Sequence, residues 1–226
     1  MGFVVEQRVS DSPLVETIMQ GRTASAGFTI RPAECHWHMV FVRHASRGGV
    51  QPLVVGPLPK AGVVSYTEGA EILWIKFKLG AFMPQRPVRD FVDTETPLPG
   101  AASQSFWLNG SAWRFPDYEN ADTFVDRLVR EDVLAWDPVV NAVLQHQRSE
   151  LSSRTVRHRF LRATGLSQNQ IQQVERAQRA ELLLRQGLSI LDTVDETGYS
   201  DQPHLTRSLK QWIGYTPAQL LQLSAP

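Results

Sequence analysis

Cysteine is almost absent from this chain of 226 residues, which contains Cys35 alone. A single thiol excludes an internal disulfide framework and a cysteine-rich zinc site, and we expect Cys35 to be a small buried apolar side chain. Long apolar runs are also lacking, since none approaches the roughly eighteen residues of a membrane span. The opening MGFVVEQRVSDSP has no basic region leading into an apolar stretch, so no signal peptide is expected and the predicted location is the cytoplasm.

Net charge is the third thing the chain lacks, because 23 Lys and Arg balance 23 Asp and Glu. The charges are unevenly distributed. Residues 148–185 contain eight arginines against three glutamates, whereas residues 186–226 contain two basic and four acidic residues. A basic segment inside a neutral chain indicates a local surface for an anionic partner such as nucleic acid.

Short β-rich runs separated by Gly and Pro fill the first half of the chain and predict an antiparallel sheet or small barrel. In EILWIKFKL, alternate residues from Leu73 to Leu79 are predicted to face the core, whereas Trp74 lies on the opposite face beside Lys76 as a candidate pocket or interface residue. The predicted strands lie in GFTI, WHMVFVRH, QPLVVG, GVVSYT, EILWIKFKL and SFWLN.

Residues 119–136 are predicted to form a connecting helix, with Phe124 and Leu128, and Val125 and Val129, paired at a spacing of four. We expect this helix to pack on the preceding sheet, and its second apolar edge could also pack against another subunit. Trp136-Asp137-Pro138 marks a boundary, because the residue before proline resists helix and Pro138 can begin the next one.

The last third of the chain contains one helix-turn-helix pattern written twice. In the second copy, Ser189 can cap a short helix that Gly198 ends, and Ser200 can cap the next. That next helix is predicted to bury its apolar stripe and to end at Gly214, and Thr216-Pro217 can begin a last helix. The predicted stripe consists of Leu205, Leu209 and Trp212.

In the first copy, Ser152 or Ser153 can cap a helix that ends at Gly165 and directs Phe160 inward. Its basic stripe, predicted to project outward, consists of Arg154, Arg157, His158 and Arg162. Ser167 can then cap a helix of roughly twenty residues, about 30 Å long, which is close to the 34 Å pitch of B-DNA. Two basic helices separated in this way suit two neighbouring turns of a DNA major groove, so DNA binding is the first hypothesis.

Residues 137–223 resemble the DNA-binding domain of the AraC/XylS family of bacterial transcription regulators. The residues that carry the resemblance are Arg154-Thr155-Val156, Phe160, Gly165, Arg179-Ala180, Leu183, Ile190, Gly198-Tyr199-Ser200-Asp201-Gln202, His204-Leu205, Arg207, Lys210, Gly214 and Thr216-Pro217. The resemblance implies base-facing residues on both helices. With their neighbours, the predicted DNA-binding residues are Ser153, Arg154, Arg157, His158, Arg162, Gln202, Pro203, His204, Thr206 and Arg207.

Three departures separate the chain from the family pattern. Only one helix fits between Asp137 and Ser153, where the family usually has two. The first helix-turn-helix unit is therefore expected to lack one of the helices that usually support it. Thr193 and Val194 stand where the family prefers an aliphatic residue and an alanine, so packing there is expected to be looser. In the helix predicted after Ser200, Leu205 and Leu209 replace the usual aromatic residues, which is a conservative change in core volume.

The first half resembles the cupin-like sensor domains that precede such DNA-binding domains. His36-Trp37-His38 supplies only the first element of a cupin metal site, so a structural or pocket role is expected in place of a metal or other cofactor. Tryptophans could line a cavity for an apolar or aromatic effector. The candidate effector-binding residues are His36, His38, Trp74 and Trp107.

These observations predict an α+β protein with three parts: a cupin-like antiparallel β-barrel at residues 1–118, the connecting helix at 119–136, and an all-α domain with two helix-turn-helix units at 137–226. The expected function is that of a non-enzymatic transcription regulator that binds double-stranded promoter DNA and responds to a small molecule. A homodimer, and contact with RNA polymerase if it activates, follow from the same hypothesis. The alternatives are a protein-interaction module or anti-regulator with a degenerate helix-turn-helix, which would explain the neutral charge, and a small cupin enzyme, which would need a complete metal site.

Overall fold

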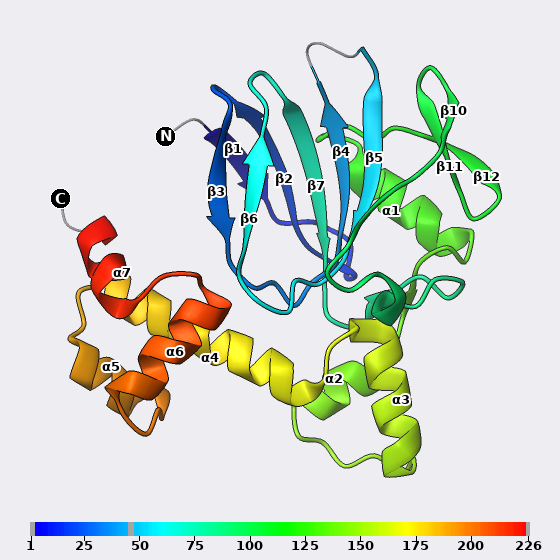
Figure 1. Cartoon of the computed structure of the whole chain (residues 1–226). Helices are drawn as coiled ribbons and strands as arrows, with labels where there is room; N and C mark the ends of the chain where they lie inside the picture. Colours follow the sequence, from blue (N-terminus) through cyan, green and yellow to red (C-terminus); the bar gives the residue numbers. More distant parts are fainter. Residues whose placement is uncertain (1–2, 45–47, 225–226) are drawn as a thin grey trace. The chain divides into compact units, whose positions relative to one another are not determined.

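The computed structural model describes residues 3–44 and 48–224 (Figure 1). These residues form two compact units. Unit 1 comprises the described residues within 1–27, 36–57 and 65–167, and unit 2 comprises those within 28–35, 58–64 and 168–226. The boundaries of these compact units differ from the domain boundaries predicted after residues 118 and 136. No helix in the described ranges is both long and apolar enough to cross a membrane.

An open antiparallel sheet of six strands forms the centre of unit 1. Its spatial order is β1 (Phe3–Arg8), β2 (Val15–Thr23), β7 (Glu71–Phe77), β4 (His38–Arg43), β5 (Val50–Val55) and β9 (Glu95–Pro97). The predicted barrel is wrong, because closure requires the two outer strands to pair with each other. Among the described residues, β1 pairs with β2 and β9 pairs with β5, so both remain edges.

The predicted alternation in β7 is confirmed. Leu73, Ile75 and Phe77 are buried on the core face, whereas Trp74 and Lys76 are half-buried on the other face. The core face also receives Trp37, whose ring stacks on Phe77 at 4.0 Å and whose Nε1 donates to the carbonyl oxygen of Ala81 at 2.7 Å. Trp37 is therefore a core residue that anchors the start of β4.

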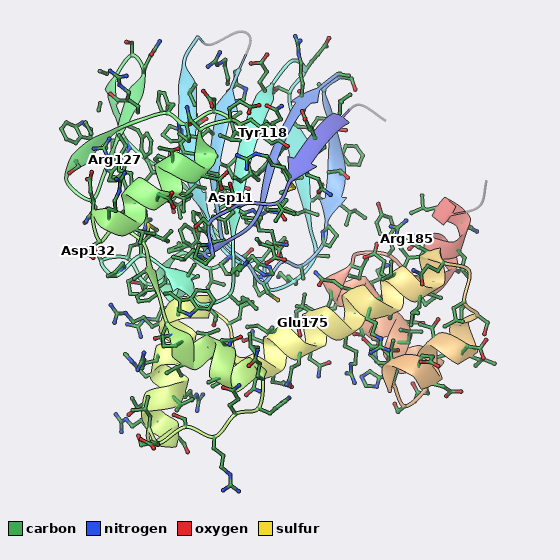
Figure 2. All side chains as sticks on the ribbon, turned by 180° about the vertical axis from the view of Figure 1, so that it is seen from behind. Asp11, Tyr118, Arg127, Asp132, Glu175 and Arg185 are labelled. Atoms are coloured by element: carbon green, nitrogen blue, oxygen red, sulfur yellow. The ribbon has the colours of Figure 1, made fainter. Side chains whose placement is uncertain are left out.

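A cluster of aromatic rings joins the sheet to α1 (Ala121–Arg130) and to a small sheet of β10 (Gly100–Ala102), β11 (Ser105–Leu108) and β12 (Ser111–Arg114). Phe41 of β4 makes edge contacts with Phe106 of β11 and Phe124 of α1 at 5.6 and 5.9 Å. Arg127, which Figure 2 labels on α1, places its guanidinium 4.6 Å from the ring centroid of buried Trp113. The helix thus packs on its own unit.

The predicted connecting helix is shorter than expected. It ends at Arg130, because Val133 and Leu134 bury their side chains and the chain then pairs as β13 (Ala135–Trp136) with β8 (Ala81–Phe82). After β13 come α2 (Pro138–Leu144) and α3 (Ser153–Thr164), and α3 contacts β8 and the 3-10 helix η1 (Val88–Phe91). As predicted, residues 137–152 hold one helix.

Unit 2 contains α4 (Gln168–Arg185), α5 (Ile190–Thr197), α6 (Gln202–Trp212) and α7 (Pro217–Ser224). Residues of β3 (Gly27–Arg31) and β6 (Gly62–Tyr66), which pair as a ribbon, complete it. The amides of Ala33 and Ala61, which flank this ribbon, donate to the carbonyl oxygens of Trp212 and Gln211 at 2.6 and 2.8 Å. Carbonyl groups at a helix end have no partner within the helix, so these two bonds stabilise the end of α6.

Candidate nucleic-acid interface

Helix α6 separates an apolar face from a polar one. Leu205, Leu209 and Trp212 are buried, as predicted from the spacing. Thr206 is half-buried, and its hydroxyl donates to the Gln202 carbonyl oxygen at 2.9 Å. The opposite face is exposed to solvent and carries donors and acceptors of the kind that contact base edges and phosphates. The exposed residues of α6 are Gln202, Pro203, Arg207, Lys210 and Gln211.

The start of α6 is held by a network around Tyr199. The N-cap is Asp201, whose Oδ1 accepts the His204 amide at 2.6 Å, and not Ser200 as predicted. Ser200 Oγ instead lies 3.1 Å from His204 Nδ1, and the His204 ring packs edge-on against Tyr199 at 5.0 Å. The Tyr199 hydroxyl is hydrogen-bonded to Ser208 at 2.7 Å. His204 is therefore half-buried, and it helps to fix the orientation of α6.

Both ends of α5, which precedes the turn to α6, are formed as the sequence predicts. Ser189 Oγ accepts the Asp192 amide at 3.1 Å and caps α5, and Gly198 ends the helix at a φ of 67°. From α4, Arg176 places its guanidinium 4.3 Å from the Tyr199 ring centroid. Because α4 and the turn share this contact, the position of α6 is set by both neighbouring helices.

Helix α3 presents the second candidate surface. Ser152 Oγ accepts the Thr155 amide at 3.2 Å, and Gly165 ends the helix at a φ of 72°. Phe160 is buried, as predicted. The residues exposed along its first two turns are Ser153, Arg154, Thr155, Arg157 and His158.

Arg162 lies differently from the outward stripe predicted for it. Its Nη2 donates to the carbonyl oxygen of Pro84 at 2.9 Å, and its guanidinium lies 5.2 Å from the Phe82 ring centroid. The side chain is half-buried in unit 1 as a consequence. A phosphate contact by Arg162 would require both contacts to break.

Half of the eight arginines of the basic segment form contacts within their own unit. Arg159 pairs with Asp137, and the hydrogen bonds that its guanidinium donates to that carboxylate raise the pKa of Arg159 above its ordinary value. Arg185 pairs with Glu181 at 2.8 Å on α4, and Arg162 and Arg176 form the contacts described above. The four that remain exposed, with no ion pair to a described residue, are Arg148, Arg154, Arg157 and Arg179.

The four candidate effector residues lie at more than one place. In the pairing of β4 with β7, His38 lies opposite Lys76 and Val40 lies opposite Trp74. His38 and Trp74 are therefore two positions apart on the same face of the sheet, which is not the core face. His36 precedes β4 and is half-buried. Trp107 is 46% exposed on β11 and lines a separate hollow together with Arg86, a residue that no sequence pattern singles out. Within the described residues, no group of three or more His, Cys, Asp or Glu could hold a metal ion.

The comparisons with known proteins bear on the helical part of the chain. Residues 147–222 match the family model described as a helix-turn-helix domain, which is of the AraC type. The match begins just before α3 and extends into α7, so it includes both candidate surfaces. It confirms the resemblance seen in the sequence for this part, and it does not extend to the β-rich part. No curated protein and no solved structure matches the chain.

Proposed function

We propose that this chain, an AraC-type DNA-binding transcription regulator by its helix-turn-helix domain at residues 147–222, recognises a specific promoter sequence through α6 and strengthens the contact through α3. The observation that carries the proposal is the two-sided character of α6. Its apolar face is fully occupied, whereas Gln202 and Arg207 are exposed on the other face. These side chains suit adenine and guanine edges in a major groove.

The surfaces of α3 and α6 differ in charge, and this difference supports different roles for them in DNA binding. Residues 186–226, which include α6, carry two basic and four acidic residues, so α6 gains little from phosphate attraction and depends on base contacts. The exposed arginines near α3 supply attraction that does not depend on sequence. Along the chain, α3 and α6 are separated by α4, which has 18 residues and is therefore about 27 Å long.

The β-rich part is proposed to control DNA binding in response to a small-molecule effector and to support a homodimer. Helix α1 does not supply the apolar edge that a dimer contact would need. Of its predicted apolar pairs, Val129 is the one member that is exposed. Of the four candidate effector residues, Trp107 supports an effector role, because its exposed ring lines a hollow in the β-rich part. An activator would also contact RNA polymerase.

Selection of bound sequences from random duplex DNA tests the proposal directly. The full chain is expected to enrich one motif, and direct repeats or palindromes in that motif report how subunits are arranged. The enriched duplex is then titrated with the wild type at several salt concentrations. If no sequence is enriched and binding to random duplex is equally weak, DNA recognition is excluded and the protein-interaction alternative takes its place.

A further inference from the structure

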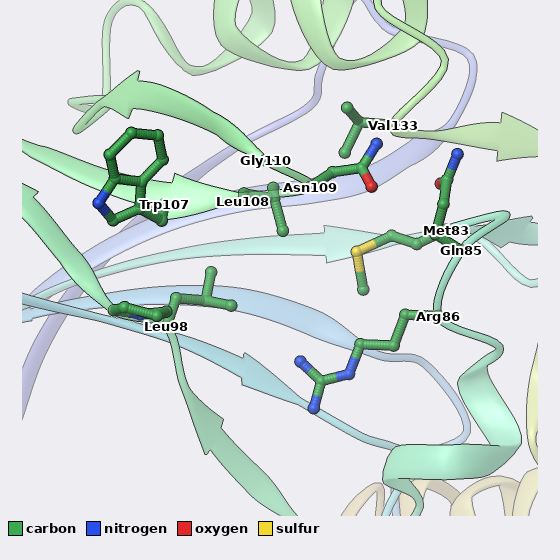
Figure 3. A pocket seen from close by; sticks show the side chains of 10 residues that line it. Met83, Gln85, Arg86, Leu98, Trp107, Leu108, Asn109, Gly110 and Val133 are labelled. Atoms are coloured by element: carbon green, nitrogen blue, oxygen red, sulfur yellow. The ribbon is translucent and has the colours of Figure 1, made fainter.

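A hollow in unit 1 has the size and lining of a small-molecule site. Its volume is about 370 Å³, which lies within the usual range for ligand pockets. Buried Leu98, Leu108 and Val133 contribute to its walls, Met83 adds a flexible thioether, and Trp107 exposes its ring at one side (Figure 3). The hairpin that carries Leu108 is fixed by a hydrogen bond from Trp113 Nε1 to the Leu108 carbonyl oxygen at 3.0 Å. A planar apolar group would be in contact with side chains on several sides.

Arg86 is the one charged residue in the lining of this hollow. Figure 3 shows its guanidinium extending beneath Met83 toward Leu98. The guanidinium contacts the Phe91 ring at 5.6 Å, and no carboxylate of the described residues forms an ion pair with it. Guanidinium groups bind carboxylates through two parallel hydrogen bonds, and Asn109 adds an amide at the rim. The chemistry favours an anion with an apolar body.

The walls of the hollow continue directly into the segments that hold α3. Met83 and Arg86 form a turn closed by the Arg86 amide, which donates to the Met83 carbonyl oxygen at 3.0 Å. Within and beside this turn, Pro84 and Phe82 are the residues that Arg162 of α3 contacts. On the other wall, the chain runs from Val133 through β13 to Asp137, the partner of Arg159. A ligand that contacts the turn therefore lies one residue from the contacts of α3.

From these observations, we propose that the hollow binds a small aryl carboxylate and that its occupancy changes DNA affinity through the 82–86 turn and Arg162. The binding part of this inference stands on the hollow alone. The regulatory part rests on the proposed function, because it needs α3 to contact DNA. By thermodynamic linkage, DNA must then change the affinity for the carboxylate by the same factor.

Calorimetric titration of the full chain with 2-naphthoate, and with the uncharged 2-naphthamide, tests the site without DNA. The carboxylate is expected to bind at least tenfold more tightly than the amide, and Arg86→Met is expected to remove that preference. Arg89→Met is the matched control, since Arg89 is exposed, lies beside Asp90 and is outside the hollow. Equal binding of the two probes to the wild type, no binding of either, or the same result for both variants would overturn the site.

Titration of the selected duplex with and without saturating 2-naphthoate tests the regulatory part. The wild type is expected to change its DNA affinity by about fivefold or more, and Arg162→Met is expected to reduce that factor while it still binds the carboxylate. If the wild type binds both ligands without mutual effect, the coupling is wrong and the site stands. If it binds 2-naphthoate but no DNA, the proposed function fails instead.

Discussion

Arg159 of α3 and Asp137 at the start of α2 form a two-point ion pair. Arg159 Nη2 donates to Asp137 Oδ1 at 2.7 Å, and Nε donates to Oδ2 at 3.0 Å. Asp137 Oδ1 also accepts the Val139 amide at 3.0 Å as the N-cap of α2. A single buried carboxylate thus joins the two helices and connects them to β13, the strand that immediately precedes it.

The first prediction concerns this ion pair. Arg159→Met is expected to lower the free energy of unfolding by about 1–2 kcal/mol, because it leaves the Asp137 carboxylate with only its cap bond. The effect is smaller than for a fully buried pair, since the Arg159 side chain is 38% exposed and solvent screens it. Urea unfolding measures the effect, with Arg157→Met as the control on an exposed position of α3. Equal destabilisation in the two variants would show that the pair does not stabilise the fold.

The arginines of α3 show what sequence spacing can and cannot predict. At about 100° per residue, Arg162 lies about 80° from Arg154 around the helix, which is close enough to predict one common stripe. In the structure, β8 and η1 pack on α3 and draw Arg162 out of this stripe. These contacts come from residues about 80 positions earlier in the chain, so spacing within α3 does not predict them. The Ser189 cap and the Leu205 and Leu209 stripe are local properties that the sequence predicts correctly. The cap of α6 is the neighbouring Asp201 and not the predicted Ser200.

Strand β2 is not predicted from the sequence, for a different reason. Its pairing with β7 shifts register between Val15 and Thr17, so Val15 and Ile18 are both buried although three positions separate them. An irregularity of this kind breaks the alternation that identifies a strand in a sequence. The pairing of residues 28–35 and 58–64 with the end of α6 is equally unpredictable, because it depends on contacts between distant parts of the chain.

The second prediction concerns the exposed face of α6. Arg207→Ala and Gln202→Ala are expected to relax sequence choice, because a bidentate base contact contributes about 1–3 kcal/mol of discrimination. The measurement is the ranking of singly mismatched duplexes by affinity. Gln211→Ala, which removes an exposed side chain near the end of the helix, is the control. A wild-type ranking in both test variants would exclude these residues as base readers.

The third prediction concerns the end of α6, where Gly214 has a φ of 89°. A Cβ there would lie 2.4 Å from Ile30 Cγ2, whereas a Cβ on Gly187, at a φ of 91°, meets nothing within 4 Å. Gly214→Ala is therefore expected to destabilise more than Gly187→Ala, whose cost of about 1–2 kcal/mol comes from backbone strain alone. Thermal unfolding of both variants measures the difference. Similar melting temperatures would show that Ile30 yields without cost.

The fourth prediction concerns acid stability. Burial raises the pKa of Asp122, but hydrogen bonds from Ser10 and Arg8, with the Arg8 charge, outweigh it and hold the pKa below its ordinary value. A lowered pKa in the folded state contributes stability that is present at neutral pH and is lost as the pH falls through about 4 and below. The difference in unfolding free energy between the wild type and Asp122→Asn should therefore shrink from pH 7 to pH 3. Asp126→Asn, an exposed change on the same helix, should show no such trend, and a constant difference for Asp122→Asn would contradict the assignment.

The last prediction separates two arginines of α3 by the salt dependence of DNA binding. Removal of one phosphate contact on duplex DNA reduces the slope of log affinity against log salt by about 0.9. Arg157 is exposed and free to reach a phosphate, so Arg157→Ala should reduce the slope by about that amount and weaken binding to all sequences alike. Arg162 is held by Pro84 and Phe82, so Arg162→Ala should leave the slope unchanged and instead lower the melting temperature of the chain.

Titrations of the selected and random duplexes at several salt concentrations decide between the two roles, with Arg207→Ala as the variant that should change sequence choice. An equal reduction in slope for Arg157→Ala and Arg162→Ala would mean that Arg162 leaves Pro84 when DNA binds. That result would keep Arg162 in the DNA interface and would make its release from the 82–86 turn a step in binding. An unchanged slope for Arg157→Ala would instead remove α3 as the source of phosphate attraction, because Arg157 is exposed at the centre of its basic stripe.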